Sequence, residues 1–241
     1  MGETTTPRRT TSIDETATGR SWRLVRRLGD PAIVTALLIL FGPSAFGDTP
    51  DTRDTNQFMA DWFVTKRTSV MVGATILALG LLAFLWFTGT VARRLEQAGH
   101  REAGSLAARS ATVAVTLMLG GEILVLAALA YVIAAEAPES VKALFELTLV
   151  TIPIVAPFVA VVPATVAWSL RSDPDVSRWF VVSSAVAAVV IAVPTVGYAY
   201  SGPLSPDVGL QIVFQGLILW LLAAGIAWPA YGRLRPRRAP A

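Results

Sequence analysis

The chain has 241 residues, of which 54% are hydrophobic and only 15% are charged, with one histidine (His100), no cysteine and a formal net charge of +3. A soluble domain of this length carries about 25% charged residues, so the composition argues against a water-soluble globule. The absence of cysteine excludes a disulfide scaffold, thiolate catalysis, iron–sulfur clusters and Cys-ligated zinc.

The first 30 residues form a tail that is rich in threonine and charge, and it is predicted to be disordered and basic because it cannot bury enough apolar surface to fold. Near its end, Trp22, Val25 and Leu28 recur at helical spacing between arginines. This pattern fits an amphipathic segment on anionic lipid, or an ordinary orientation signal beside a membrane span. The orientation signal is the preferred interpretation.

Six apolar stretches follow, and each is predicted to be a transmembrane helix because about 20 apolar residues cross a hydrocarbon core. The stretches cover 31–47, 69–91, 110–135, 147–170, 179–200 and 208–231. The fold class is therefore an all-α bundle of six transmembrane helices over residues 31–231, with a basic tail over 232–241.

The first stretch has a second interpretation. Its basic flank, its short apolar run and the small residues Ala45 and Gly47 resemble a signal peptide with a cleavage site. The leader of 30 residues ahead of it is long for a signal peptide, so we expect this stretch to be retained as a span.

The basic residues predict the orientation. Of the 20 Lys and Arg residues, 16 fall on the two tails and on the connections after the second and fourth stretches. The positive-inside rule then places both termini in the cytoplasm of a cell whose inner membrane holds the protein, with the lipid bilayer as its first partner. Because the arginines are dispersed over four segments, nucleic acid is not an expected partner.

The loop between the first two stretches is predicted to hold a short helix at the outer interface. Phe58 and Trp62 are spaced four residues apart, and Thr55 or Asn56 can cap the helix. Together with Phe63, these aromatic residues are candidates for a lid or for a surface that docks a partner. A plain interfacial anchor is the simpler interpretation.

Residues 56–95 read NQFMADWFVTKRTSVMVGATILALGLLAFLWFTGTVARRL. This segment resembles six-span integral membrane proteins of high-GC bacteria, which have an acidic and aromatic helix, then a span that ends in Leu-Trp-Phe-x-Gly, then an Arg-rich turn. The 18 arginines against two lysines fit such a source. The resemblance implies a six-helix membrane fold and implies no activity, because none is assigned to those proteins.

Glu122 is the one ionisable residue in the middle of a predicted span. Insertion of Asp, Lys or Arg at such a depth costs roughly 2.5–3.5 kcal/mol, and Glu is taken as similar. The residues one turn away on the same helix are all apolar. A partner for the carboxyl group must therefore come from another helix or from water.

Several residues are candidates for that partner. Pro153 and Pro157 lack an N–H and are predicted to interrupt the fourth span, which would free carbonyl groups near Glu122. Gln215, with Gln211 one turn outward, can reach the same depth from the last span. The cluster is either a proton or cation site, as in carriers with discontinuous helices, or a structural hydrogen bond between helices.

The sequence contains no phosphate-binding GxxxxGK[ST] loop, no H-E-x-x-H, no G-x-S-x-G and no paired carboxylates at catalytic spacing. We therefore expect no enzyme, no cofactor and no metal. The favoured function is a non-enzymatic accessory or regulatory membrane subunit that binds a membrane protein partner or copies of itself. The alternative is a small proton- or cation-coupled transporter, or a membrane-embedded ligand-binding protein, centred on Glu122. A lipid-modifying enzyme ranks third.

Overall fold

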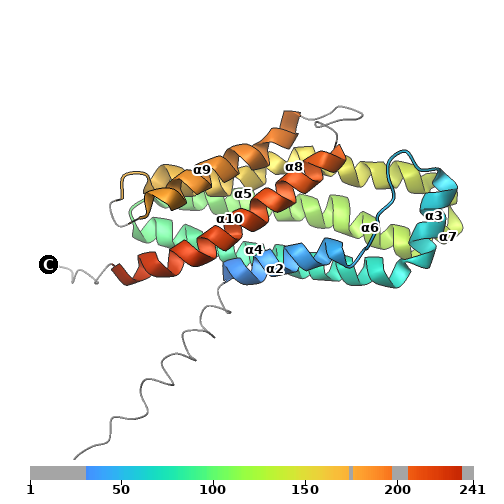
Figure 1. The fold of residues 1–241 in the computed structure, drawn as a ribbon, viewed down its shortest axis with the longest axis horizontal. Coiled ribbons are helices and arrows are strands. Elements are labelled where there is room, and N and C mark those ends of the chain that lie inside the picture. Colours follow the sequence, from blue (N-terminus) through green and yellow to red (C-terminus); the bar gives the residue numbers. More distant parts are fainter. Residues whose placement is uncertain (1–30, 174–175, 197–205, 235–241) are drawn as a thin grey trace, which may run out of the picture.

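The structure is a computed structural model that describes residues 31–173, 176–196 and 206–234, and the regular elements within them are all helices (Figure 1). In chain order they are α2 (Pro31–Ser44), α3 (Asn56–Thr65), α4 (Arg67–Gln97), α5 (Arg101–Met118), η1 (Leu119–Ile123), α6 (Leu124–Ala128), η2 (Leu129–Ile133), α7 (Ala134–Glu136), η3 (Pro138–Ser140), α8 (Val141–Leu170), α9 (Arg178–Ala192), η4 (Val193–Val196) and α10 (Pro206–Leu234). The predicted N-terminal tail, residues 197–200 of the fifth stretch and the end of the C-terminal tail lie outside the described residues.

Within the described residues, five helices are long and apolar enough to cross a membrane, which confirms the all-α prediction and indicates a membrane-embedded protein. They are Arg67–Gln97, Arg101–Glu136, Pro138–Leu170, Arg178–Thr195 and Val208–Ala227. The first predicted span is different, because α2 is apolar but has only 14 residues. At 1.5 Å per residue it extends about 21 Å, less than the roughly 30 Å of a hydrocarbon core.

The long helices run roughly side by side, and α10 crosses one face of the bundle between α9 and α2 (Figure 1). Helices α4, α5 and α8 pack in chain order, and α10 closes the bundle by packing on α2, α8 and α9. The main hydrophobic core lies between these helices and draws side chains from each of them. The buried stripe of each helix therefore faces the bundle axis.

Two glycines allow backbones to touch. A Cβ atom at Gly73 of α4 would lie 2.7 Å from the carbonyl oxygen of Gly42 in α2, and a Cβ at Gly104 of α5 would lie 2.7 Å from the carbonyl oxygen of Ala92 in α4. Small residues at such crossings are the usual means of close helix packing in membranes. The close packing of α4 against α2 and of α5 against α4 therefore depends on glycine at these two positions.

Helix α3 lies across one end of the bundle (Figure 1). The Thr55 hydroxyl accepts a hydrogen bond from the backbone N–H of Phe58 at 3.2 Å, so the predicted cap is confirmed at Thr55. Met59 and Phe63 are fully buried in a second hydrophobic cluster beneath α3, where the Phe63 ring meets Phe145 edge to face. The apolar face of this short helix is thus what holds it on the bundle.

The Asn56 side chain links α3 to the η3–α8 segment by hydrogen bonds. The amide nitrogen of Asn56 donates to the carbonyl oxygen of Glu139 at 3.3 Å, and its amide oxygen accepts from the backbone N–H of Lys142 at 3.1 Å. The Lys142 ammonium group also donates to the carbonyl oxygen of Asp54 at 3.1 Å. Because these contacts join segments more than 80 residues apart, they hold α3 as a cap over this end.

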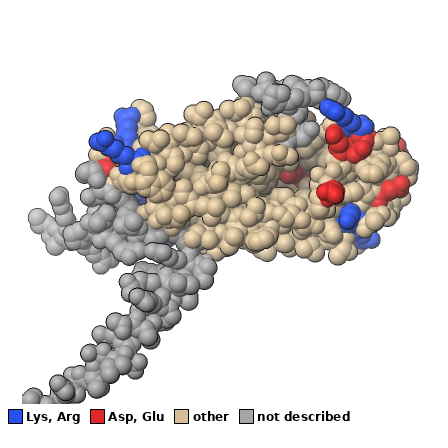
Figure 2. Space-filling model, in the orientation of Figure 1, with Lys and Arg blue, Asp and Glu red and all other residues tan. Residues whose placement is uncertain are grey.

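The charged side chains gather at the two ends of the molecule, and the surface between them is apolar (Figure 2). Large hydrophobic residues such as Val189, Leu219 and Ile226 are exposed along this middle zone. A band of exposed apolar side chains between charged ends is the surface that a lipid bilayer covers.

Candidate functional site

The helix over residues 101–136 contains two π-helical segments, η1 (Leu119–Ile123) and η2 (Leu129–Ile133). A π turn holds more residues than an α turn, and such turns occur frequently at functional sites. The first one carries Glu122 directly after Gly120 and Gly121. Sequence reasoning did not predict the π segments, and the adjacent glycines were the one local sign of irregular geometry.

Glu122 points into the bundle. Only 6% of the residue is exposed, and Met118 and Leu126, each four residues away, are buried on the same stripe. Its Oε2 atom is enclosed and has no hydrogen-bond partner among the described residues. Buried polar atoms in native proteins nearly always have a partner, which makes this carboxyl oxygen an exception within the described bundle.

Helix α8 is the neighbour of this segment. A Cβ atom at Gly121 would lie 2.9 Å from the hydroxyl oxygen of Thr151 and 3.1 Å from its methyl carbon. The Thr151 hydroxyl donates to the carbonyl oxygen of Leu147 at 3.2 Å, which leaves a lone pair on the hydroxyl oxygen as an acceptor. The glycine therefore brings the backbone beside Glu122 against a polar group of α8.

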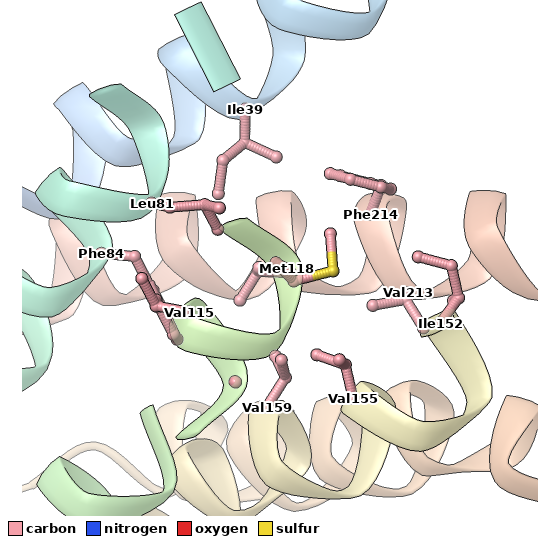
Figure 3. Close-up of a pocket in the computed structure, with 12 residues that line it drawn as sticks. Ile39, Leu81, Phe84, Val115, Met118, Ile152, Val155, Val159, Val213 and Phe214 are labelled. Carbon is pink, nitrogen blue, oxygen red and sulfur yellow. The ribbon is translucent and has the colours of Figure 1, made fainter. Parts of the chain in front are cut away.

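A small apolar cavity of about 30 Å³ lies at the centre of the bundle, where α2, α4, α5, α8 and α10 converge (Figure 3). Its walls include Met118, one turn from Glu122, and Ile152, the residue after Thr151. A space of this size holds about one water molecule, and cavities without polar walls stay dry. This cavity is thus too small for a drug-sized ligand, since such sites have roughly 300–1,000 Å³.

The predicted interruption of the fourth span is wrong. Helix α8 runs continuously for 30 residues through Pro153, Pro157 and Pro163. Pro153 is buried and Pro157 is half-buried, so both rings lie against neighbouring helices. Packing of α8 between α5 and α9 keeps the backbone helical, even though each proline removes one hydrogen bond.

The structure does not bring the two glutamines to Glu122. Gln211 and Gln215 are exposed on α10, whereas Val213 and Leu217 of the same helix are buried. Because successive residues of a helix are about 100° apart, the apolar stripe that faces the core turns both amides outward. The position of the two glutamines in the sequence predicted their level within the span. The direction in which their side chains point depends on the packing of α10.

The three aromatic residues of α3 also differ in their exposure. Phe58 is 52% exposed, and Phe63 is fully buried. Trp62 is half-buried, and its indole N–H donates to the carbonyl oxygen of Asp48 at 2.8 Å. Phe63 therefore belongs to the core, and only Phe58 presents a large face that a partner can reach.

No protein-family model, curated protein or solved structure matches the chain. Within the described ranges, no three His, Asp or Glu residues lie close enough together to hold a metal ion. Glu122 is the one acidic residue that the described apolar spans carry at mid-depth.

Proposed function

We propose that the chain is a six-span protein of the cytoplasmic membrane with both termini in the cytoplasm. Packing supports termini on one side, because Ile33 near the start of α2 lies 2.7 Å from a Cβ position at Gly225, near the end of α10. Six arginines gather at this end of the described bundle, which the positive-inside rule assigns to the cytoplasm. They are Arg93, Arg94, Arg101, Arg109, Arg171 and Arg178. The short helix α2 supplies the sixth crossing.

Within this membrane domain, Glu122 acts as the site of a proton or cation, in a small coupled transporter or a membrane-embedded binding protein. The observation that carries the proposal is the enclosed Oε2 atom without a described partner, in a π turn on the inward face. A leucine or methionine here would continue the stripe of Met118 and Leu126 without the cost of burying a carboxyl group. A single carboxyl group among apolar side chains suits a proton or a small cation better than an organic ligand, because an organic ligand would need several polar contacts to fix its orientation.

The test is proton movement in vesicles. The full chain is reconstituted in liposomes that contain a pH-sensitive dye, and an inward proton gradient is applied. We expect Glu122→Gln, which has nearly the same shape but cannot ionise, to lose the flux that the wild type carries. Glu122→Asp keeps an acid and should retain part of that flux.

Glu136→Gln is the matched control, because Glu136 is an exposed acid at the end of the same helix. This variant should behave as the wild type does. Equal flux through the Glu122→Gln and wild-type proteins, or no wild-type flux above that of empty liposomes, would refute proton transport at Glu122. Thermal unfolding of each variant in detergent separates loss of function from loss of fold.

The accessory-subunit function is the second candidate, and the exposed Phe58 ring at the capped end of the bundle favours it. A helix that is fixed by Met59, Phe63 and Asn56 presents this ring at a defined position. Native mass spectrometry after gentle extraction from native membranes distinguishes the two functions. A stoichiometric protein partner supports the accessory subunit, and a lone chain counts against it.

A further inference from the structure

A second, larger pocket lies at the arginine-rich end of the bundle, opposite α3. It has a volume of about 380 Å³ and opens to the surface between the α4–α5 turn and the end of α8. It is lined by Ala98, His100, Trp168, Ser169, Arg171, Ser172 and Asp173. Unlike the central cavity, this pocket has polar as well as apolar walls, and it has enough room for a phosphate-sized group.

Arg171 is held in place at the rim of this pocket. Its guanidinium carbon lies 3.6 Å from the centre of the Trp168 ring. Such stacking uses the face of the guanidinium plane and leaves the N–H donors along its edge directed outward. A positioned planar fork of donors is the arrangement that binds phosphate oxygens in pairs.

Other donors surround the same space. His100 and Ser172 are exposed and line the pocket. Ser169 also lines it, and its enclosed hydroxyl oxygen has no hydrogen-bond partner within the described chain. Asp173, the one acid among the described lining residues, already has an interaction within the chain. The exposed part of the walls can therefore offer a guanidinium, an imidazole and the Ser172 hydroxyl group to an anion.

The position of the pocket relative to the membrane surface indicates where that anion comes from. Trp168 is 66% exposed, and the side chains of Trp86 and Trp179 are likewise exposed at the same end. Tryptophan prefers the boundary between headgroups and hydrocarbon, so the pocket opens where lipid phosphates lie. This end carries six arginines and only three acidic residues near them, Glu96, Glu102 and Asp173. Its excess of positive charge favours a leaflet with anionic lipids.

We propose that this pocket binds the phosphate headgroup of an anionic phospholipid from the adjoining leaflet, with Arg171 as the main contact. Trp168 positions the guanidinium group and borders the acyl chains. His100 and Ser172 complete the contacts to the headgroup. The site is separate from Glu122, and its occupancy does not depend on the function proposed for that residue.

The test measures lipid binding to the full chain in detergent micelles by native mass spectrometry. Short-chain phosphatidylglycerol and phosphatidylcholine are titrated separately, and inorganic phosphate is added as a competitor. We expect phosphatidylglycerol to bind more tightly than phosphatidylcholine and to resist millimolar phosphate. Arg171→Gln should weaken phosphatidylglycerol binding about tenfold, as the loss of a hydrogen bond to a charged group does.

Arg178→Gln is the matched control, because Arg178 is an exposed arginine of the same end that does not line the pocket. This variant should keep the wild-type preference. Equal binding of the two lipids, or equal effects of the two arginine variants, would overturn the proposal. Displacement of the lipid by inorganic phosphate at its own binding concentration would identify a free-anion site instead and would also overturn it.

Discussion

At the scale of single residues, some buried polar groups of the described bundle are hydrogen-bonded and others have no partner. The indole N–H of Trp220, a residue that is 2% exposed, donates to the Ser184 hydroxyl at 3.0 Å. The Trp220 ring also meets Phe87 edge to face, so one side chain links α10, α9 and α4. Glu122 is also buried, yet its Oε2 atom has no described partner. Trp220 therefore has a structural role, and Glu122 is the residue for which we propose a functional role.

The Trp220–Ser184 pair gives a prediction about stability. Ser184→Ala would leave a buried indole N–H unpaired, which costs about 1–3 kcal/mol, so the variant should unfold at a lower temperature in detergent. The control is Ser183→Ala, because the Ser183 hydroxyl is half-buried and donates only to the carbonyl oxygen of Phe180 at 3.0 Å in its own helix. Equal melting temperatures for Ser184→Ala and the wild type would contradict the structural role.

At the scale of elements, the α4–α5 contact depends on Gly104. Gly104→Ala would place a methyl group 2.7 Å from the carbonyl oxygen of Ala92, which is backbone and cannot rotate away. We expect the helices to be forced apart, with a loss of about 1–3 kcal/mol of unfolding free energy. Gly89→Ala on α4 meets no atom within 4 Å and should be neutral or slightly stabilising, since alanine favours helix. Chemical denaturation in mixed micelles measures both, and equal effects would refute the close contact.

Much of this element pattern could be predicted from the sequence, because apolar length alone identifies long membrane helices. The short helix capped by Thr55 was also predicted correctly, from its i,i+4 aromatic spacing. The continuity of α8 could not be predicted, since it depends on neighbours that hold three prolines in a helix. The outward direction of Gln215 likewise follows from the packing of α10. The π turn at Glu122 has no clear sequence signal beyond the two glycines.

At the scale of the whole molecule, the proposed orientation can be tested directly because the chain has no cysteine. Single substitutions Gln57→Cys in α3 and Gln97→Cys at the end of α4 place matched reporters at exposed positions on opposite ends of the bundle. A membrane-impermeant maleimide should label position 57 in intact cells and label position 97 only after lysis. The reverse pattern would invert the topology, and labelling of both positions in intact cells would contradict an intact transmembrane bundle.

The two π turns in the helix over residues 101–136 have a consequence for how Glu122 could change its environment. Each π turn accommodates an extra residue within an otherwise α-helical path. Movement of the first π turn along the helix by one peptide would rotate the local side chains by up to about 100° without breaking the helix. The carboxyl group would then leave the inward stripe through a change of backbone register, while the helix ends stayed in place.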